Sequence, residues 1–139
     1  MTPLPDGRSD TAKSQRQVLL VEDEPKLRSL VQNFLEFKGF TVIAASSGEE
    51  ALERLARSSP QVVLLDIKLP GMDGLLTLKH LRISHPTLPV IVLTQADEDQ
   101  TKREAVRLGA HEYLTKPFDF EHLGTLLRAQ VLTSGGGSQ

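Results

Sequence analysis

Four short apolar runs in the chain each end at a chemically reactive polar residue. The runs VLLV, VVLL, VIVL and EYLT are followed by Glu22-Asp23, Asp66, Thr94 and Lys116. Apolar runs of this length, separated by helical patterns, are typical of buried parallel strands. Because ligands bind beyond the carboxyl ends of the strands in an open α/β sheet, we expect these side chains to converge at one edge of one sheet.

Strand patterns alternate with helical patterns through the central part of the chain. The expected strands cover residues 17–22, 40–45, 61–66, 90–94 and 112–115. A regular alternation favours a parallel sheet with helices on both faces. We therefore predict an α/β, flavodoxin-like, doubly wound fold, with a five-stranded parallel sheet of order 2-1-3-4-5 and five helices. In that order the first and third strands are neighbours, so Glu22 and Asp23 are expected beside Asp66.

Several residues between the expected strands are typical of helix starts. Pro25 suits the first helical position, and Ser47 with Glu50 three residues later forms a capping box. Asp73 and Asp119 can cap the helices that follow them. These signals support helices between the strands.

Length and composition indicate one small domain. The chain has 139 residues, which favours a single unit. We expect residues 1–15 to be a flexible lead, residues 16–132 to form the domain, and the Gly/Ser-rich residues 133–139 to be a tail or linker. Net charge is −2, so the domain lacks the basic footprint of a nucleic-acid-binding protein.

Other features of the composition bear on location. There are no cysteines, which excludes disulfides and thiolate metal sites and fits a reducing cytoplasm. No apolar stretch approaches the roughly 20 residues that cross a bilayer, and the start MTPLPDGRSD is unlike a secretory signal. We expect a cytoplasmic protein that binds no membrane.

The three acidic residues have a chemical and a structural interpretation. Carboxylate oxygens suit Mg²⁺, and carboxylates close together repel one another unless a cation lies among them. A carboxylate at a rigid strand end, such as Asp66, can act as a nucleophile and form an aspartyl-phosphate. Alternatively, Glu22, Asp23 and Glu24 only favour the following helix start through its dipole, and Asp66 caps a turn.

The chain also resembles a known family. The segments VLLVEDEPKLR, VVLLDIKLPGMDG, VIVLTQAD and GAHEYLTKPF are similar to the receiver domain of two-component response regulators, of the CheY-like type. The resemblance extends over residues 17–131. It implies that Asp66 is the phosphoacceptor, and that Mg²⁺ is bound by Glu22, Asp23, Asp66 and the backbone carbonyl of Lys68.

The resemblance also implies a switch. Thr94 matches the hydroxyl that moves toward the phosphoryl group, Lys116 matches the lysine that pairs with that group, and a cis Lys116-Pro117 bond is expected. Tyr113, the only tyrosine, matches the switch aromatic. Gln95 departs from the small residue that is common after the switch threonine.

The implied function is a phosphorylation-activated receiver domain. A sensor histidine kinase or a histidine phosphotransfer protein would donate the phosphoryl group. The face made by the fourth helix, the fifth strand and the fifth helix would then change state, and it could bind an effector domain or form a homodimer. Chemistry would be limited to Mg²⁺-dependent self-phosphorylation and self-dephosphorylation, so the protein is not expected to be an enzyme.

Four alternatives remain open from the sequence. The chain could be a single-domain phosphorelay carrier, or a receiver cut from a longer regulator. It could be a degenerate receiver that serves only for docking. A Mg²⁺-dependent phosphatase with Asp66 as nucleophile is a further reading, but such enzymes usually carry a second aspartate two residues later, and this chain has Lys68 there.

Overall fold

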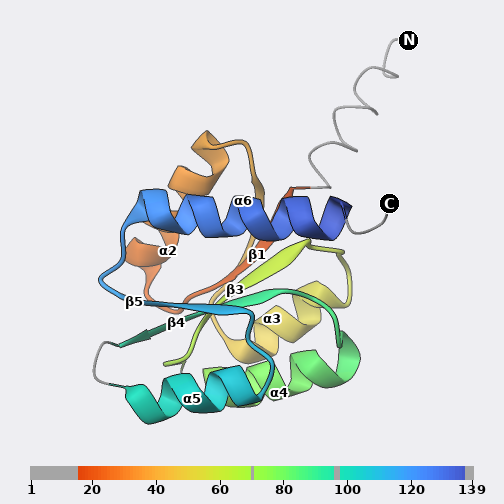
Figure 1. The fold of residues 1–139 in the computed structure, drawn as a ribbon, viewed down its shortest axis with the longest axis vertical. Coiled ribbons are helices and arrows are strands. Elements are labelled where there is room, and N and C mark those ends of the chain that lie inside the picture. Colours follow the sequence, from red (N-terminus) through yellow and green to blue (C-terminus); the bar gives the residue numbers. More distant parts are fainter. Residues whose placement is uncertain (1–15, 70, 96–97, 137–139) are drawn as a thin grey trace.

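A computed structural model of the protein describes residues 16–69, 71–95 and 98–136. Over these ranges the chain forms one parallel sheet of order β2-β1-β3-β4-β5. This result confirms the predicted flavodoxin-like sheet (Figure 1). The strands are β1 Gln17–Val21, β2 Thr41–Ala45, β3 Val62–Asp66, β4 Val90–Gln95 and β5 Glu112–Lys116. The lead expected over residues 1–15 lies outside the described residues.

Helices cover both faces of the sheet, as predicted. Figure 1 shows α2 and α6 on one face and α3, α4 and α5 on the other. In the part of the chain that the structure describes, these are the only helices, so the number predicted is also confirmed. Their bounds are α2 Pro25–Phe37, α3 Gly48–Leu55, α4 Gly74–Ser84, α5 Asp99–Arg107 and α6 Phe120–Gly136.

The strands are apolar on both faces because each face is buried under helices. In β1, Leu19 and Val21 belong to the core under α3, α4 and α5, whereas Val18 and Leu20 belong to the core under α2 and α6. All four side chains are fully buried. Burial on both sides explains why β1, β3 and β4 are continuous apolar runs rather than alternating ones.

The helix starts follow the capping signals. The Ser47 hydroxyl accepts from the Glu50 amide at 3.1 Å, and Asp73 accepts from the Leu76 amide at 2.9 Å. Pro25 is the first residue of α2. At the other end of the chain, α6 continues to Gly136 and so includes residues 133–136 of the expected tail. Once a helix has formed, each added residue contributes one more backbone hydrogen bond.

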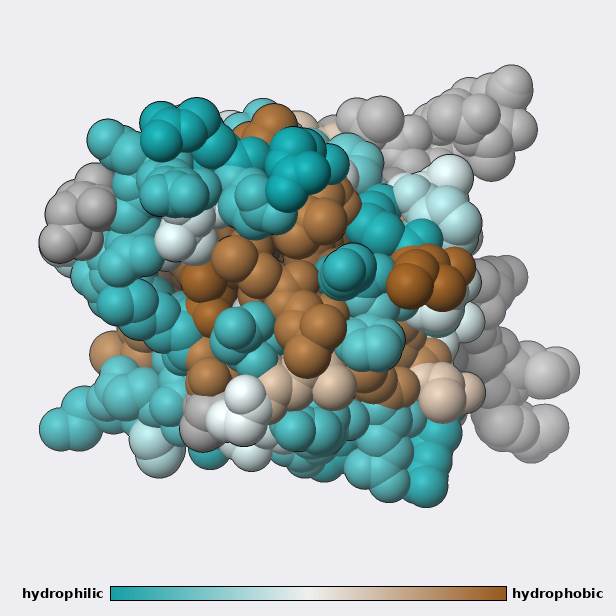
Figure 2. Space-filling model, turned by 90° about the horizontal axis from the view of Figure 1, so that it is seen from below, coloured by the Kyte–Doolittle hydropathy of each residue, from teal (hydrophilic) through white to brown (hydrophobic). Residues whose placement is uncertain are grey.

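The face that carries α3, α4 and α5 exposes apolar side chains. Figure 2 shows them gathered across the middle of this face between hydrophilic borders. Exposed large apolar residues there include Leu76 and Ile83 of α4 and Val106 of α5. None of the helices in the described ranges has the length and hydrophobicity needed to cross a membrane.

Candidate functional site: an acidic pocket at the carboxyl edge of the sheet

Parallel pairing brings the predicted residues to the same edge of the sheet. Val21 pairs with Leu65, so Glu22 and Asp66 follow at the same level on neighbouring strands. Across the next two strands, Thr94 pairs with Thr115, and Gln95 pairs with Lys116. The predicted convergence therefore follows from the strand order and register.

Three carboxylates meet at this edge. Glu22, Asp23 and Asp66 each offer an oxygen within 4.8 Å of the others. Glu22 and Asp66 are only 1% and 2% exposed, whereas Asp23 is exposed. The cluster is thus a buried pair of acids with a third acid open to solvent, a donor set that can hold a divalent cation.

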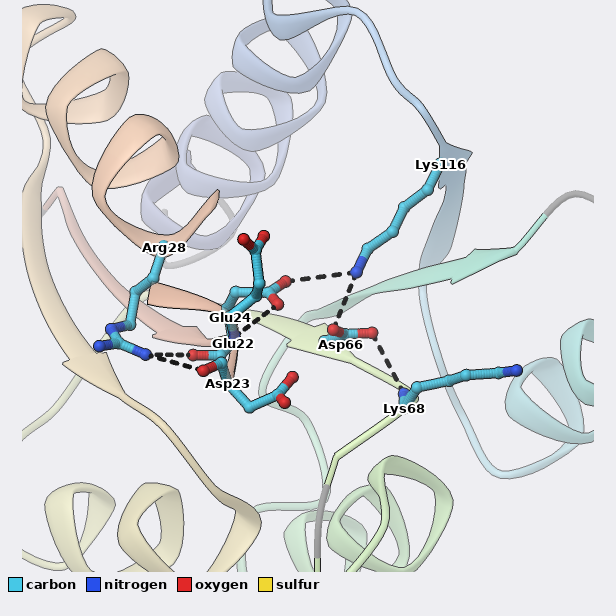
Figure 3. A network of polar contacts seen from close by, with 7 residues as sticks. All are labelled: Glu22, Asp23, Glu24, Arg28, Asp66, Lys68 and Lys116. Carbon is cyan, nitrogen blue, oxygen red and sulfur yellow. Dashed lines mark hydrogen bonds and ion pairs between the residues drawn. The ribbon is translucent and has the colours of Figure 1, made fainter. Parts of the chain in front are cut away.

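Lys116 enters the same pocket from β5, as Figure 3 shows. Its ammonium lies 2.9 Å from Asp66 Oδ2 and 3.4 Å from Glu22 Oε1. The Lys116-Pro117 bond is cis, as the resemblance implies. One cation therefore contacts both buried carboxylates.

Backbone contacts fix the acids. The Lys68 amide donates to Asp66 Oδ1 at 3.1 Å, and the Glu24 amide donates to Glu22 Oε2 at 3.2 Å. The Arg28 guanidinium donates to the Glu22 carbonyl at 2.9 Å. No pattern in the sequence marks Arg28 or Glu24 as part of the site, because Arg28 is one of several charged residues of α2 and Glu24 lies immediately before that helix.

The pocket carries more negative charge than its lysine balances. Burial and the neighbouring charge of Asp66 raise the pKa of Glu22 to about 7, against the opposing effects of the Glu24 amide and Lys116. Burial lowers the pKa of Lys116, but its hydrogen bond to Asp66 and the charges of Asp66 and Glu22 outweigh burial and raise it. A bound divalent cation would relieve the excess charge, so the residues present fit a metal site.

Thr94 and Tyr113 lie apart from these ionic contacts. Thr94 is buried, and its hydroxyl has no hydrogen-bond partner among the described residues. Tyr113 is 43% exposed and lines a groove of about 320 Å³ with residues of α5, where the Lys102 ammonium lies 5.6 Å from its ring centre. The structure therefore places Thr94 at the pocket edge and Tyr113 against α5.

The side chain of Lys68 points away from Asp66 (Figure 3). Its ammonium instead pairs with Glu98 Oε2 at 3.2 Å. No pattern in the sequence marks Glu98 as a partner of Lys68, because their contact depends on the neighbouring positions of β3 and β4. A glycine close to Asp66 is also required: a Cβ on Gly74 would lie 2.5 Å from the Asp66 carbonyl oxygen.

Comparison with known proteins identifies the family. The family model of the response regulator receiver domain matches residues 18–128. The chain therefore belongs to the receiver domains of two-component response regulators. Among solved structures, it is similar to the receiver domain of NtrX from Brucella abortus, with a TM-score of 0.80, 32% identity, and coverage of 84% of this chain and 98% of that one.

Curated relatives are regulators with additional sequence. The uncharacterized transcriptional regulatory protein YkoG of Bacillus subtilis is 39% identical over 118 residues, which are 85% of this chain and 52% of YkoG. The alkaline phosphatase synthesis transcriptional regulatory protein PhoP of the same organism is 38% identical over 114 residues, 82% of this chain and 48% of PhoP. The chain thus spans about half the length of these relatives.

Proposed function

We propose that the protein is a phosphorylation-activated receiver whose phosphoacceptor is Asp66. A histidine kinase or histidine phosphotransfer protein would present a phosphohistidine. An Asp66 carboxylate oxygen attacks phosphorus, an O–P bond forms, the N–P bond breaks, and the donor histidine leaves with the bonding pair. The observation that carries this proposal is the convergence of Asp66, two further acids and the Lys116 ammonium in one pocket.

The residues of the pocket have separate roles in this proposal. Glu22, Asp23, Asp66 and the Lys68 carbonyl would hold Mg²⁺, which when bound neutralises charge on the phosphoryl oxygens. Lys116 donates a hydrogen bond to the same group and holds Asp66 in place beforehand. The Thr94 hydroxyl, which has no other partner in the described chain, is free to donate to a phosphoryl oxygen.

Two surfaces serve partners. An apolar groove of about 350 Å³ beside Lys116, which would receive the phosphodonor, is lined by Leu27, Leu30, Gln95, Lys116, Pro117, Phe118 and Phe120. The face of α5, β5 and α6 would report the phosphorylated state through Thr94 and Tyr113 to an effector domain or to a second copy. The protein would act on itself alone, with no outside substrate.

Uptake of a phosphoryl group from acetyl phosphate tests this function. Intact mass measured with Mg²⁺ should show one added phosphoryl group per wild-type chain and none on Asp66→Asn. The conservative change removes the nucleophile but keeps the shape of the side chain. Equal uptake by both proteins would rule out Asp66 as the acceptor.

A further inference from the structure

An ion pair outside the acidic pocket links two of the strand ends that build it. Lys68 lies two residues after Asp66, and Glu98 lies four residues after Thr94, at the start of α5. Their Nζ and Oε2 atoms are 3.2 Å apart. Because β3 and β4 are neighbours, the pair connects the segment after Asp66 to the helix after Thr94.

Glu98 is the fixed member of the pair. The Thr101 hydroxyl donates to Glu98 Oε1 at 2.9 Å, and the Glu98 carbonyl accepts from the Lys102 amide at 2.9 Å. The hydrogen bonds from Thr101 and Lys68 lower the pKa of Glu98, so its carboxylate is charged at neutral pH. These contacts anchor the carboxylate to the first turn of α5.

Lys68 is the movable member. Its backbone is fixed by the hydrogen bond from its amide to Asp66 Oδ1, but its side chain is 59% exposed. A lysine ammonium is a compact charge on a flexible four-carbon stem with three donors. The ammonium can therefore leave Glu98 without any change in the backbone at Asp66.

A phosphoryl group on Asp66 would compete with Glu98 for this ammonium. The Asp66 carboxylate loses its single charge when the O–P bond forms, and the phosphoryl group in its place carries about −1.5 to −2 charges on three strong acceptor oxygens. This total exceeds the single charge of Glu98. Mg²⁺ and Lys116 would each neutralise part of this charge, but Lys116 is shared between Asp66 and Glu22, and the acids of the pocket share the metal. A further cation close in sequence to Asp66 would therefore be attracted to the phosphoryl oxygens, and Lys68 is two residues away.

We propose that the Lys68 ammonium binds Glu98 in the unphosphorylated protein and moves to the phosphoryl group when Asp66 is phosphorylated. There it acts as a second side-chain cation beside Lys116. This inference rests on the proposed function. The transfer breaks the contact between Lys68 and α5, and so couples phosphorylation to the start of α5 by a route separate from Thr94. By thermodynamic reciprocity, loss of Glu98 favours the phosphorylated state.

Binding of beryllofluoride, a phosphoryl analogue, at constant Mg²⁺ tests the proposal by calorimetry. Glu98→Gln should lower the dissociation constant by about two- to fivefold, the range expected for a solvent-accessible ion pair. Lys68→Met keeps the backbone carbonyl and should raise the dissociation constant, whereas Lys68→Arg should largely restore wild-type binding. In the Lys68→Met background, Glu98→Gln should have no further effect.

Glu104→Gln is the matched control. It also removes one negative charge from the region of α5, but the wild-type Glu104 pairs with Arg107 and not with Lys68. This variant should leave the dissociation constant unchanged. Equal tightening by Glu98→Gln with and without Lys68, or no tightening at all, would overturn the inference alone. Equal binding of beryllofluoride by wild type and Asp66→Asn would overturn the proposed function as well.

Discussion

At the scale of single residues, two buried groups in the pocket cost stability, for different reasons. The Thr94 hydroxyl has no hydrogen-bond partner in the described structure, and an unpaired buried polar group loses its hydration without compensation. The Glu22 carboxylate accepts from the Glu24 amide and from Lys116, but it is buried beside the charge of Asp66, and both effects raise its pKa. Such costs are expected where a site is preorganised for a charged ligand.

Thr94→Val tests this view of the hydroxyl. The substitution keeps the branched shape and removes a polar atom without a partner, so the free energy of unfolding should stay the same or rise by about 1 kcal/mol. Urea denaturation measures this value. Beryllofluoride should bind less tightly to the variant, because it loses a donor. A fall in unfolding free energy above about 1 kcal/mol would show that the hydroxyl is already paired.

Glu22 predicts a pH dependence of stability. Its pKa is raised from 4.5 to about 7 on folding, so the folded state binds more protons between these values. The protonated Glu22 side chain therefore makes its full contribution to the free energy of unfolding below about pH 4.5. This contribution is lost as the pH rises through about 7. Urea denaturation without metal should show this loss in wild type but not in Glu22→Gln, and Mg²⁺ should offset it. Identical pH profiles for the two proteins would contradict the assignment.

At the scale of elements, the apolar runs were sufficient to predict the strands. All five strands were predicted within one residue at each end, because runs such as those of β3 and β4 are buried on both faces. Individual side-chain contacts were not predictable. Glu98 binds Lys68 only because the sheet order places β3 beside β4. Arg28 lies six residues after Glu22 and binds its carbonyl, a contact that no pattern in the local sequence marks. The extension of α6 to Gly136 was also not predicted, because residues 133–136 are rich in glycine and serine, which are weak helix formers.

Two glycines provide an opposed pair of predictions for the elements beside the pocket. A Cβ on Gly74 would lie 2.4 Å from the Ile67 Cα, so Gly74→Ala should lower the unfolding free energy by about 1–3 kcal/mol. A Cβ on Gly124, inside α6, would lie 3.4 Å from Phe34, an ordinary contact. Gly124→Ala should therefore raise the unfolding free energy by about 0.5–1 kcal/mol, because alanine loses less backbone freedom than glycine when a helix forms. Urea denaturation measures both, and equal effects would contradict the packing described.

At the scale of the whole molecule, the site exists only in the folded chain. Glu22 and Lys116 are 94 positions apart, and Asp66 and Lys116 are 50 apart, yet these side chains meet in one pocket. Parallel strands make this possible because every strand ends at the same edge. The same geometry places the apolar groove lined by Leu30 next to Lys116, so a docked donor would lie beside the acceptor.

Leu30→Arg tests the docking role of that groove. With a histidine kinase from the source organism that phosphorylates the wild type, the variant should lower the transfer rate about tenfold relative to the rate with acetyl phosphate, the size of effect seen for contact residues at interfaces. Phe37→Arg is the matched control, because Phe37 is an 85% exposed residue of the same helix outside the groove. Equal losses in both variants would show that α2 acts through its overall charge.

Mapping the modified residue is the most direct test of the central claim, that distant acids and a lysine converge to make Asp66 a metal-dependent phosphoacceptor. After treatment with acetyl phosphate, tandem mass spectrometry of peptides should find the phosphoryl group on Asp66, and only when Mg²⁺ is present. Modification at another residue, or equal modification of Asp66 after the metal has been removed with a chelator, would contradict the account.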